Sequence, residues 1–349
     1  MRILYVSKTR LDYSLNSVWI KGLKENGVEV LCFKLPSSGV TGYLRALSFV
    51  RKEKAGSDAL IVGYDSSLLA VFLHPFYWKK MIYCAVLPVY ERLVTSRKLV
   101  GCWSPKSIYY WLIDFLAYYS ADLSMIESDN QIDYISRHYF VSKNKFVRSW
   151  IGADENNFFR DSDIPKLPIF TVLFRGILMP EAGAEYVVQA AKILEKEKIN
   201  FIMISGGMLL AEIKKLIKKV KPKNLEIKSE LLSYEELRTT MQKCHLSLGQ
   251  LSDHSRLKRT VPHKSYESLA MRLPYLTASN AAIFELVKTG ETCISCEPAN
   301  AKSLADKILW AKNNYQELEK IAENGYQFYQ KELKSKILAQ KLLDKISTI

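Results

Sequence analysis

The segment from Arg256 to Glu267 places several cations beside the expected start of a helix. Four cations lie within nine residues: Arg256, Lys258, Arg259 and Lys264. Pro262 suits the first turn of the helix, and its free backbone N–H groups together with these cations would form a site for a diphosphate. Glu267, one turn inside, is then placed to accept hydrogen bonds from a ribose diol. The alternative is a basic surface loop followed by an amphipathic helix.

A second group of charged residues follows a predicted strand that ends near Cys84. Glu91, Arg92 and Arg97 lie in the expected loop after this strand. We single out Glu91 and Arg97 as candidate catalytic residues that would contact an acceptor. No spacing typical of metal ligands accompanies them, so we expect no metal site and no bound cofactor.

Alternating strands and helices are expected to position both groups. In the first half, short apolar segments such as Ile3–Val6, Ala59–Val62 and Met81–Val86 are typical of buried strands separated by helices. A second alternating series starts at Ile169–Phe174 and runs through Tyr275–Thr277. Strands separated in this way indicate parallel β-α-β units. We therefore expect an α/β fold with two doubly wound parallel sheets and a ligand cleft at the carboxyl ends of their strands.

The composition suits a two-domain enzyme. At 349 residues the chain is long enough for two domains, and 48% of its residues are hydrophobic. Its six cysteines are scattered, which suits a reducing compartment, and the Cys293/Cys296 pair has no second pair of metal ligands nearby. We see no signal peptide and no uncharged run long enough to span a membrane. The expected location is the cytoplasm.

The net charge of +14 calls for an anionic partner or surface, unless it reflects only solvated helix faces. No RRM, KH or helix-turn-helix pattern is present, which argues against nucleic acid. The aromatic segment Ser107–Tyr119, with Lys98 and Lys106 nearby, could lie on an anionic membrane surface. The alternative for this segment is a core helix of the first domain.

One stretch carries a family resemblance. Thr260–Thr277 (TVPHKSYESLAMRLPYLT) resembles the signature of retaining GT-B glycosyltransferases of the family 4 type, with five residues in register: Lys264, Tyr266, Glu267, Ala270 and Pro274. Ala281–Leu286 resembles the family's closing segment around the donor sugar, with Glu285 in register. Gly176 and Gly183 match the glycines of its first donor-domain loop. The resemblance implies a GT-B architecture, in which two Rossmann-like domains face a cleft.

Four positions depart from that family. Arg259 stands where the family has the first Glu of its E-x7-E pair, and Ile177 and Ala182 stand where it has a phosphate-binding Arg and Lys. Arg272 replaces a glycine in the turn before a strand. We expect nearby cations to supply the lost charge. The predicted donor-binding residues are Arg175, Gly176, Lys258, Arg259, Lys264, Glu267 and Glu285, with Lys264 also catalytic.

These observations predict a glycosyltransferase that moves a sugar, with retention, from a nucleoside-diphosphate-sugar to a glycan or polyprenyl-linked acceptor. Residues 1–160 would form the acceptor domain, 161–324 the donor domain, and helix 325–349 would pack back onto the first domain. The enzyme would work in the cytoplasm, peripherally on the inner face of the membrane. Two alternatives remain: a non-catalytic glycosyltransferase-like subunit and a nucleotide-sugar 2-epimerase.

Overall fold

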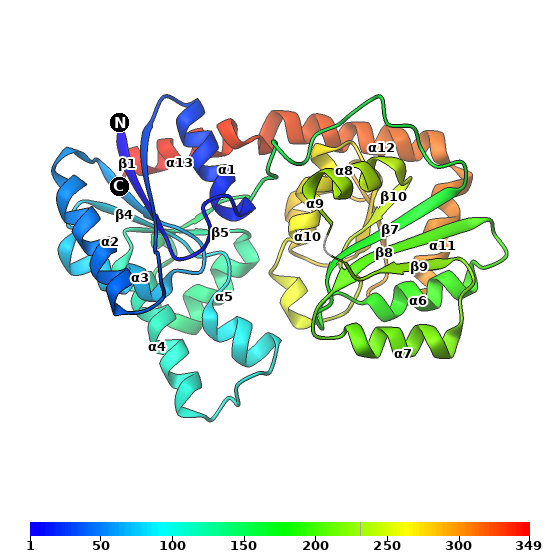
Figure 1. The fold of residues 1–349 in the computed structure, drawn as a ribbon, viewed down its shortest axis with the longest axis horizontal. Coiled ribbons are helices and arrows are strands. Elements are labelled where there is room, and N and C mark those ends of the chain that lie inside the picture. Colours follow the sequence, from blue (N-terminus) through cyan, green and yellow to red (C-terminus); the bar gives the residue numbers. More distant parts are fainter. Residues whose placement is uncertain (231) are drawn as a thin grey trace. The chain divides into compact units, whose positions relative to one another are not determined.

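The computed structural model describes residues 1–230 and 232–349, which form two compact units (Figure 1). Unit 1 comprises Met1–Asp154 together with Leu333–Ile349, and unit 2 comprises Glu155–Glu332. These boundaries lie a few residues from those expected at 160/161 and 324/325. Within the described residues, each unit contains one six-stranded parallel sheet. The structure thus confirms the predicted α/β fold with two Rossmann-like parallel sheets.

Unit 1 is built around a sheet with the strand order β2-β1-β3-β4-β5-β6. Its central strands are almost entirely buried, as expected for parallel strands covered by helices on both faces. The elements are β1 (Arg2–Ser7), α1 (Ser14–Glu25), β2 (Glu29–Lys34), α2 (Val40–Glu53), β3 (Ala59–Val62), α3 (Ser67–Leu73), β4 (Lys80–Cys84), α4 (Pro105–Ser120), β5 (Leu123–Ile126), α5 (Asp129–Tyr139), β6 (Phe146–Arg148) and α13 (Ser335–Ser347).

The last helix, α13, belongs to unit 1 although it follows unit 2 in the chain. Leu338, Leu342 and Ile346 form its buried stripe. A Cβ atom at Gly22 of α1 would lie 2.0 Å from the carbonyl oxygen of Ser335. Only glycine therefore lets α1 and α13 approach this closely.

Unit 2 contains a sheet with the order β12-β11-β10-β7-β8-β9. The elements are β7 (Phe170–Ile177), α6 (Ala184–Ile193), β8 (Ile199–Gly206), α7 (Leu210–Val220), β9 (Leu225–Lys228), α8 (Tyr234–Lys243), β10 (Leu246–Leu248), α9 (His263–Ala270), β11 (Tyr275–Ala278), α10 (Ile283–Leu286), β12 (Ile294–Cys296), α11 (Ala301–Asn313) and α12 (Tyr315–Phe328). A short 3-10 helix (Ser255–Lys258) precedes α9.

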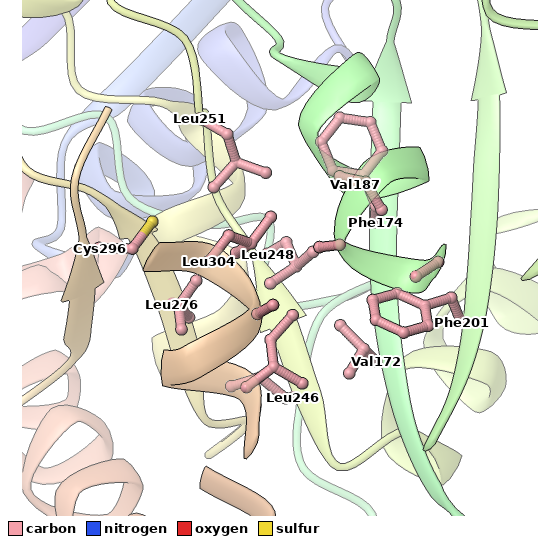
Figure 2. Packing of buried hydrophobic residues seen from close by; sticks show 14 of the residues in the cluster. Val172, Phe174, Val187, Phe201, Leu246, Leu248, Leu251, Leu276, Cys296 and Leu304 are labelled. Carbon is pink, nitrogen blue, oxygen red and sulfur yellow. The ribbon is translucent and has the colours of Figure 1, made fainter. Parts of the chain in front are cut away.

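Apolar side chains from one face of this sheet form the core of unit 2 (Figure 2). Phe174 and Val172 of β7 meet Phe201 of β8 and Leu248 of β10, and helices α6 and α11 cover them. Because this face is fully packed, polar side chains of the same strands can gather only at the strand ends or on the other face.

Several local expectations needed correction. Helices α3 and α5 were not predicted from the sequence, and the C-terminal helix expected over residues 325–349 is interrupted by a π-helical turn at Tyr329–Leu333. Arg272, the residue at the family's glycine position, adopts a left-handed backbone with φ 53°. Its side chain pairs with Glu323 of α12, which holds the cation at the surface of the turn.

Candidate functional site

Lys264 lies where the connections of the unit 2 sheet diverge. β7 and β10 are neighbours in the sheet, but the chain continues from β7 to β8 toward one edge and from β10 to β11 toward the other. Open α/β sheets bind ligands at such a point. The Lys264 amine donates to the carbonyl of Gly249, just after β10, at 3.4 Å and sits 4.5 Å from the centre of the Phe174 ring. At Gly176, φ is 120°, and a Cβ atom there would lie 3.7 Å from the amine. The amine therefore reaches both strand ends.

The charge of Lys264 is poorly compensated. Its side chain is buried and forms no ion pair within the described part of the chain. Burial, with the Arg175 guanidinium nearby, lowers the pKa of the Lys264 amine to about 7, although Glu267 acts in the opposite direction. An anionic ligand would supply the counter-charge that the protein lacks here.

Glu267, one turn inside α9, forms a buried ion pair with Arg175 of β7. Its other oxygen, Oε1, lies 3.3 Å from Nδ1 of His263. Burial opposes ionisation of Glu267, but Arg175 and His263 outweigh burial and lower the pKa of the carboxyl to about 2. Nε of Arg175 and Nε2 of His263 are buried without a hydrogen-bond partner among the described residues. The Arg175 Nε–H is a donor that a bound anion could satisfy.

The loop between β7 and α6 takes part in a second, partly buried ion pair. Glu181 in this loop accepts a 2.6 Å hydrogen bond from Arg256 of the 3-10 helix. Ala182, at the family's lysine position, is buried, and Ile177, at its arginine position, is exposed. Arg256, which the sequence analysis did not include among the donor-binding residues, is therefore the cation that the structure brings to this loop.

A cavity of about 480 Å³ opens beyond the carboxyl ends of β7 and β8. Arg175 and Gly176 line it, together with Gly206 at the end of β8, Gly207 directly after it and Leu237 of α8. A Cβ atom at Gly207, where φ is 122°, would lie 3.0 Å from the backbone nitrogen of Leu178. This cavity was not predicted from the sequence; the Gly206-Gly207 pair at the end of a strand was the signal for it.

The other predicted donor residues are distributed around this cluster. Lys258 is exposed on the 3-10 helix, Arg259 is half-buried at its end, and Glu285 is half-buried in α10. The structure thus brings Arg175, Gly176, Lys264 and Glu267 together. Lys258, Arg259 and Glu285 lie on neighbouring segments of the same unit.

In unit 1, Asn16 organises the polar end of the sheet. Its Nδ2 donates to Thr9 Oγ1 at 2.9 Å and to the Arg10 carbonyl at 2.8 Å, and its Oδ1 accepts from the Tyr64 backbone at 3.1 Å. These bonds join the loops after β1 and β3, the neighbouring strands at which the order of this sheet reverses. Arg92 pairs at 2.7 Å with Asp65 in the second of these loops. The sequence analysis did not identify Asn16 or Asp65.

The two predicted acceptor residues lie in a π-helical segment, Glu91–Ser96, and at its end, not in an open loop. Glu91 is buried and accepts a 2.7 Å hydrogen bond from Gln131 of α5. Arg97 is half-buried after the last π-helical residue. Only Arg97 of the two is partly open to solvent.

Residues 1–230 and 232–349 contain neither a metal-binding cluster nor a membrane-spanning helix. No cluster of three or more His, Cys, Asp or Glu side chains is arranged to hold a metal ion. None of the helices in this part of the chain is both long and apolar enough to cross a bilayer.

Comparisons with known proteins define the class. Residues 155–328 match the family described as glycosyl transferases group 1. The solved structure of HepE from Anabaena, in complex with UDP and glucose, superposes with a TM-score of 0.73 over 100% of both chains at 14% identity. Sucrose-phosphate synthase from Thermosynechococcus elongatus superposes with a TM-score of 0.75 at 12% identity, covering 100% of this chain and 98% of that one. No curated protein matches this sequence.

The fold is therefore the GT-B fold of glycosyltransferases. The protein is a glycosyltransferase, and residues 155–328 of its second unit match the model of group 1 glycosyl transferases.

Proposed function

We propose that unit 2 binds a nucleoside-diphosphate-sugar and that the enzyme transfers its sugar with retention of anomeric configuration. The observation that carries this proposal is Lys264, a buried cation at the point where the sheet's connections diverge, which has no ion pair within the described residues. A diphosphate would supply its missing counter-charge. The structure of Anabaena HepE with UDP supports a nucleoside diphosphate as the donor's leaving group.

Each part of the donor has a proposed place. The diphosphate lies against Lys264, Arg175 and the first backbone N–H groups of α9, where positive charge stabilises the departing group. The ribose hydroxyls bind the remaining lone pairs of Glu267, whose pairing with Arg175 and His263 keeps it ionised. The base enters the cavity of about 480 Å³ beside Gly207. Arg256 of the 3-10 helix, which pairs with Glu181 of the loop after β7, acts in place of the missing loop cations.

Unit 1 is proposed to bind the acceptor, a glycan or a polyprenyl-linked glycan, at the cytoplasmic face of the membrane. Arg97 and the Arg92–Asp65 pair are its candidate contacts. Glu91 is proposed to act through Gln131 as a positioning residue, because its carboxylate is buried.

The donor proposal is tested by titrating the full chain with UDP-, GDP-, ADP- and dTDP-sugars and following thermal unfolding. A ligand at 100 times its Kd adds about 2.7 kcal/mol of stability. We expect one nucleotide class to stabilise the wild type and to stabilise Lys264→Ala much less. Lys218→Ala, which removes an exposed lysine of α7 in the same unit, is the matched control.

Turnover separates binding from chemistry. Lys264→Ala should lower kcat more than it raises KM, because the charge of the leaving group grows as the glycosidic bond breaks. Product NMR reports the anomeric configuration. An inverted product would refute retention, and equal donor stabilisation of wild type and Lys264→Ala would refute the donor site.

A further inference from the structure

Unit 1 exposes an unusual number of large apolar side chains on α2, α3 and α4, three helices that lie side by side (Figure 1). Val40 and Leu44 of α2 and Leu68 of α3 are exposed. With Ser38, Tyr43 and Phe72 they line a groove of about 270 Å³. The groove between α2 and α3 is therefore lined mainly by apolar side chains and is open to solvent.

The first half of α4 continues this surface. Ile108, Tyr109 and Leu112 are exposed, and burial together with the nearby Tyr109 raises the pKa of Tyr43 of α2. α4 also packs along α3. The exposed residues of the three helices thus form one apolar face.

The loop before α4 adds to this face. Trp103 is 95% exposed, and Leu99 is exposed as well. By contrast, Trp111 stacks on Phe115 and Tyr118 is buried, so the other side of α4 is core. The aromatic segment singled out in the sequence therefore serves the core with one side and meets solvent with the other.

The exposed charges within the three segments that form the apolar face have one sign. Residues 35–52, 66–81 and 97–112 contain no Asp or Glu, whereas Arg45, Lys98 and Lys106 are exposed among them. Unit 1 as a whole holds 24 of the 50 Lys and Arg but only 14 of the 36 Asp and Glu, and so carries +10 of the net +14. A second copy of this face would be repelled by the same charges, whereas an anionic bilayer complements both its charge and its apolar groups.

We propose that the apolar face of α2, α3 and α4 binds an anionic lipid bilayer. Val40, Leu44, Leu68, Ile108 and Trp103 enter the boundary between headgroups and acyl chains, and the groove beside Phe72 receives a lipid hydrocarbon chain. Lys98, Lys106 and Arg45 contact anionic headgroups. The proposal names the surface on which the proposed lipid-linked acceptor is met, and it does not depend on the donor site.

Vesicle flotation of the full chain tests it. Wild type should float with vesicles that contain phosphatidylglycerol, weakly with pure phosphatidylcholine, and less as salt rises. Lys98→Ala and Lys106→Ala should each weaken binding about fivefold. Leu44→Glu and Ile108→Glu should each weaken it about tenfold or more.

Matched controls come from unit 2. Ile193 of α6 is 53% exposed, close to the 54% of Leu44, so Ile193→Glu makes the same chemical change away from the face. Lys218→Ala is the control for the lysines. Neither control should change flotation. Circular dichroism and thermal melting confirm that each variant is folded.

The outcomes separate this inference from the proposed function. If the face binds membranes, Leu44→Glu loses flotation but keeps the donor affinity of the wild type. Wild type that binds donor but no anionic vesicle overturns the membrane surface alone. If the wild type dimerises without lipid and Leu44→Glu is monomeric, the membrane proposal is overturned and the apolar face is a protein interface.

Discussion

The buried pair of Glu267 and Arg175 allows a quantitative prediction of stability. The pKa of Glu267 falls from its ordinary 4.5 to about 2 in the folded chain. Each tenfold change in proton affinity is worth about 1.4 kcal/mol, so ionised Glu267 contributes about 3 kcal/mol to the stability of unit 2. Removing one partner of a buried pair costs a similar 3–5 kcal/mol or so, because the other charge stays buried.

Glu267→Gln removes this contribution while preserving shape. At pH 7 we expect it to destabilise unit 2 by about 3 kcal/mol. Because the folded pKa is depressed, the stabilisation is fully present above pH 4.5 and is lost as pH falls toward 2. The difference between wild type and Glu267→Gln should therefore shrink to about half at pH 3.

The assay must report unit 2 alone, because a two-unit chain need not unfold in one step. The protein is equilibrated in urea and then given a brief pulse of hydrogen exchange, which is read on peptides from β7 and α9. These peptides report the unfolding of unit 2 alone. Arg175→Met and the double variant complete a double-mutant cycle. We expect it to give a coupling free energy of about 2–3 kcal/mol between Glu267 and Arg175. Glu226→Gln, which breaks an exposed pair with Lys228 in the same unit, should cost less than about 1 kcal/mol.

Two results would refute the reasoning. One is a loss of less than about 1 kcal/mol in the unfolding free energy of unit 2 for Glu267→Gln at pH 7. The other is additivity of the two single variants, which would mean that Glu267 and Arg175 do not stabilise each other.

Two further predictions concern the donor site and its loop. Because the pKa of Lys264 is about 7 without ligand and a diphosphate favours its protonated form, nucleotide-sugar affinity should fall as pH rises from 7 to 9, by up to about tenfold per pH unit. Calorimetry in buffers of different ionisation enthalpy should show proton uptake for wild type and none for Lys264→Ala; a flat wild-type profile would contradict this. Gly183→Ala should destabilise unit 2 by about 2 kcal/mol or more, because φ is 69° there and the new Cβ atom would lie 2.6 Å from the Ser252 nitrogen. Gly206→Ala, whose Cβ would meet nothing within 4 Å, should change urea stability little, and equal losses for both would count against the steric argument.

The sequence determined the architecture, because the signals for it are local. Buried parallel strands are continuous apolar runs, so Ile3–Val6 and Ile169–Phe174 could be identified without knowledge of their neighbours. The helix that begins at His263, directly after Pro262, could be predicted for the same reason. α3 was missed because an uncharged run gives no helical periodicity to read.

The composition of the donor site was decided by tertiary contacts. Glu181 and Arg256 are far apart in the chain, and only the packing of the β7–α6 loop on the 3-10 helix makes them partners. Likewise, the sequence identified Glu267 and Arg175 separately, but their pairing follows from α9 lying against the end of β7. Arg175, Lys258 and Arg259 were the replacement cations expected from the sequence, whereas the structure places Arg256 against the loop.

The same division holds in unit 1. The sequence showed that Ser107–Tyr119 is aromatic and left open whether it is core or surface, because Tyr, Trp and Phe suit both environments. Helical geometry and the neighbouring helices divided its residues, with Tyr118 turned into the core and Tyr109 left exposed. Local sequence thus determines which elements form, whereas burial and the meeting of distant strand ends determine which side chains can act together.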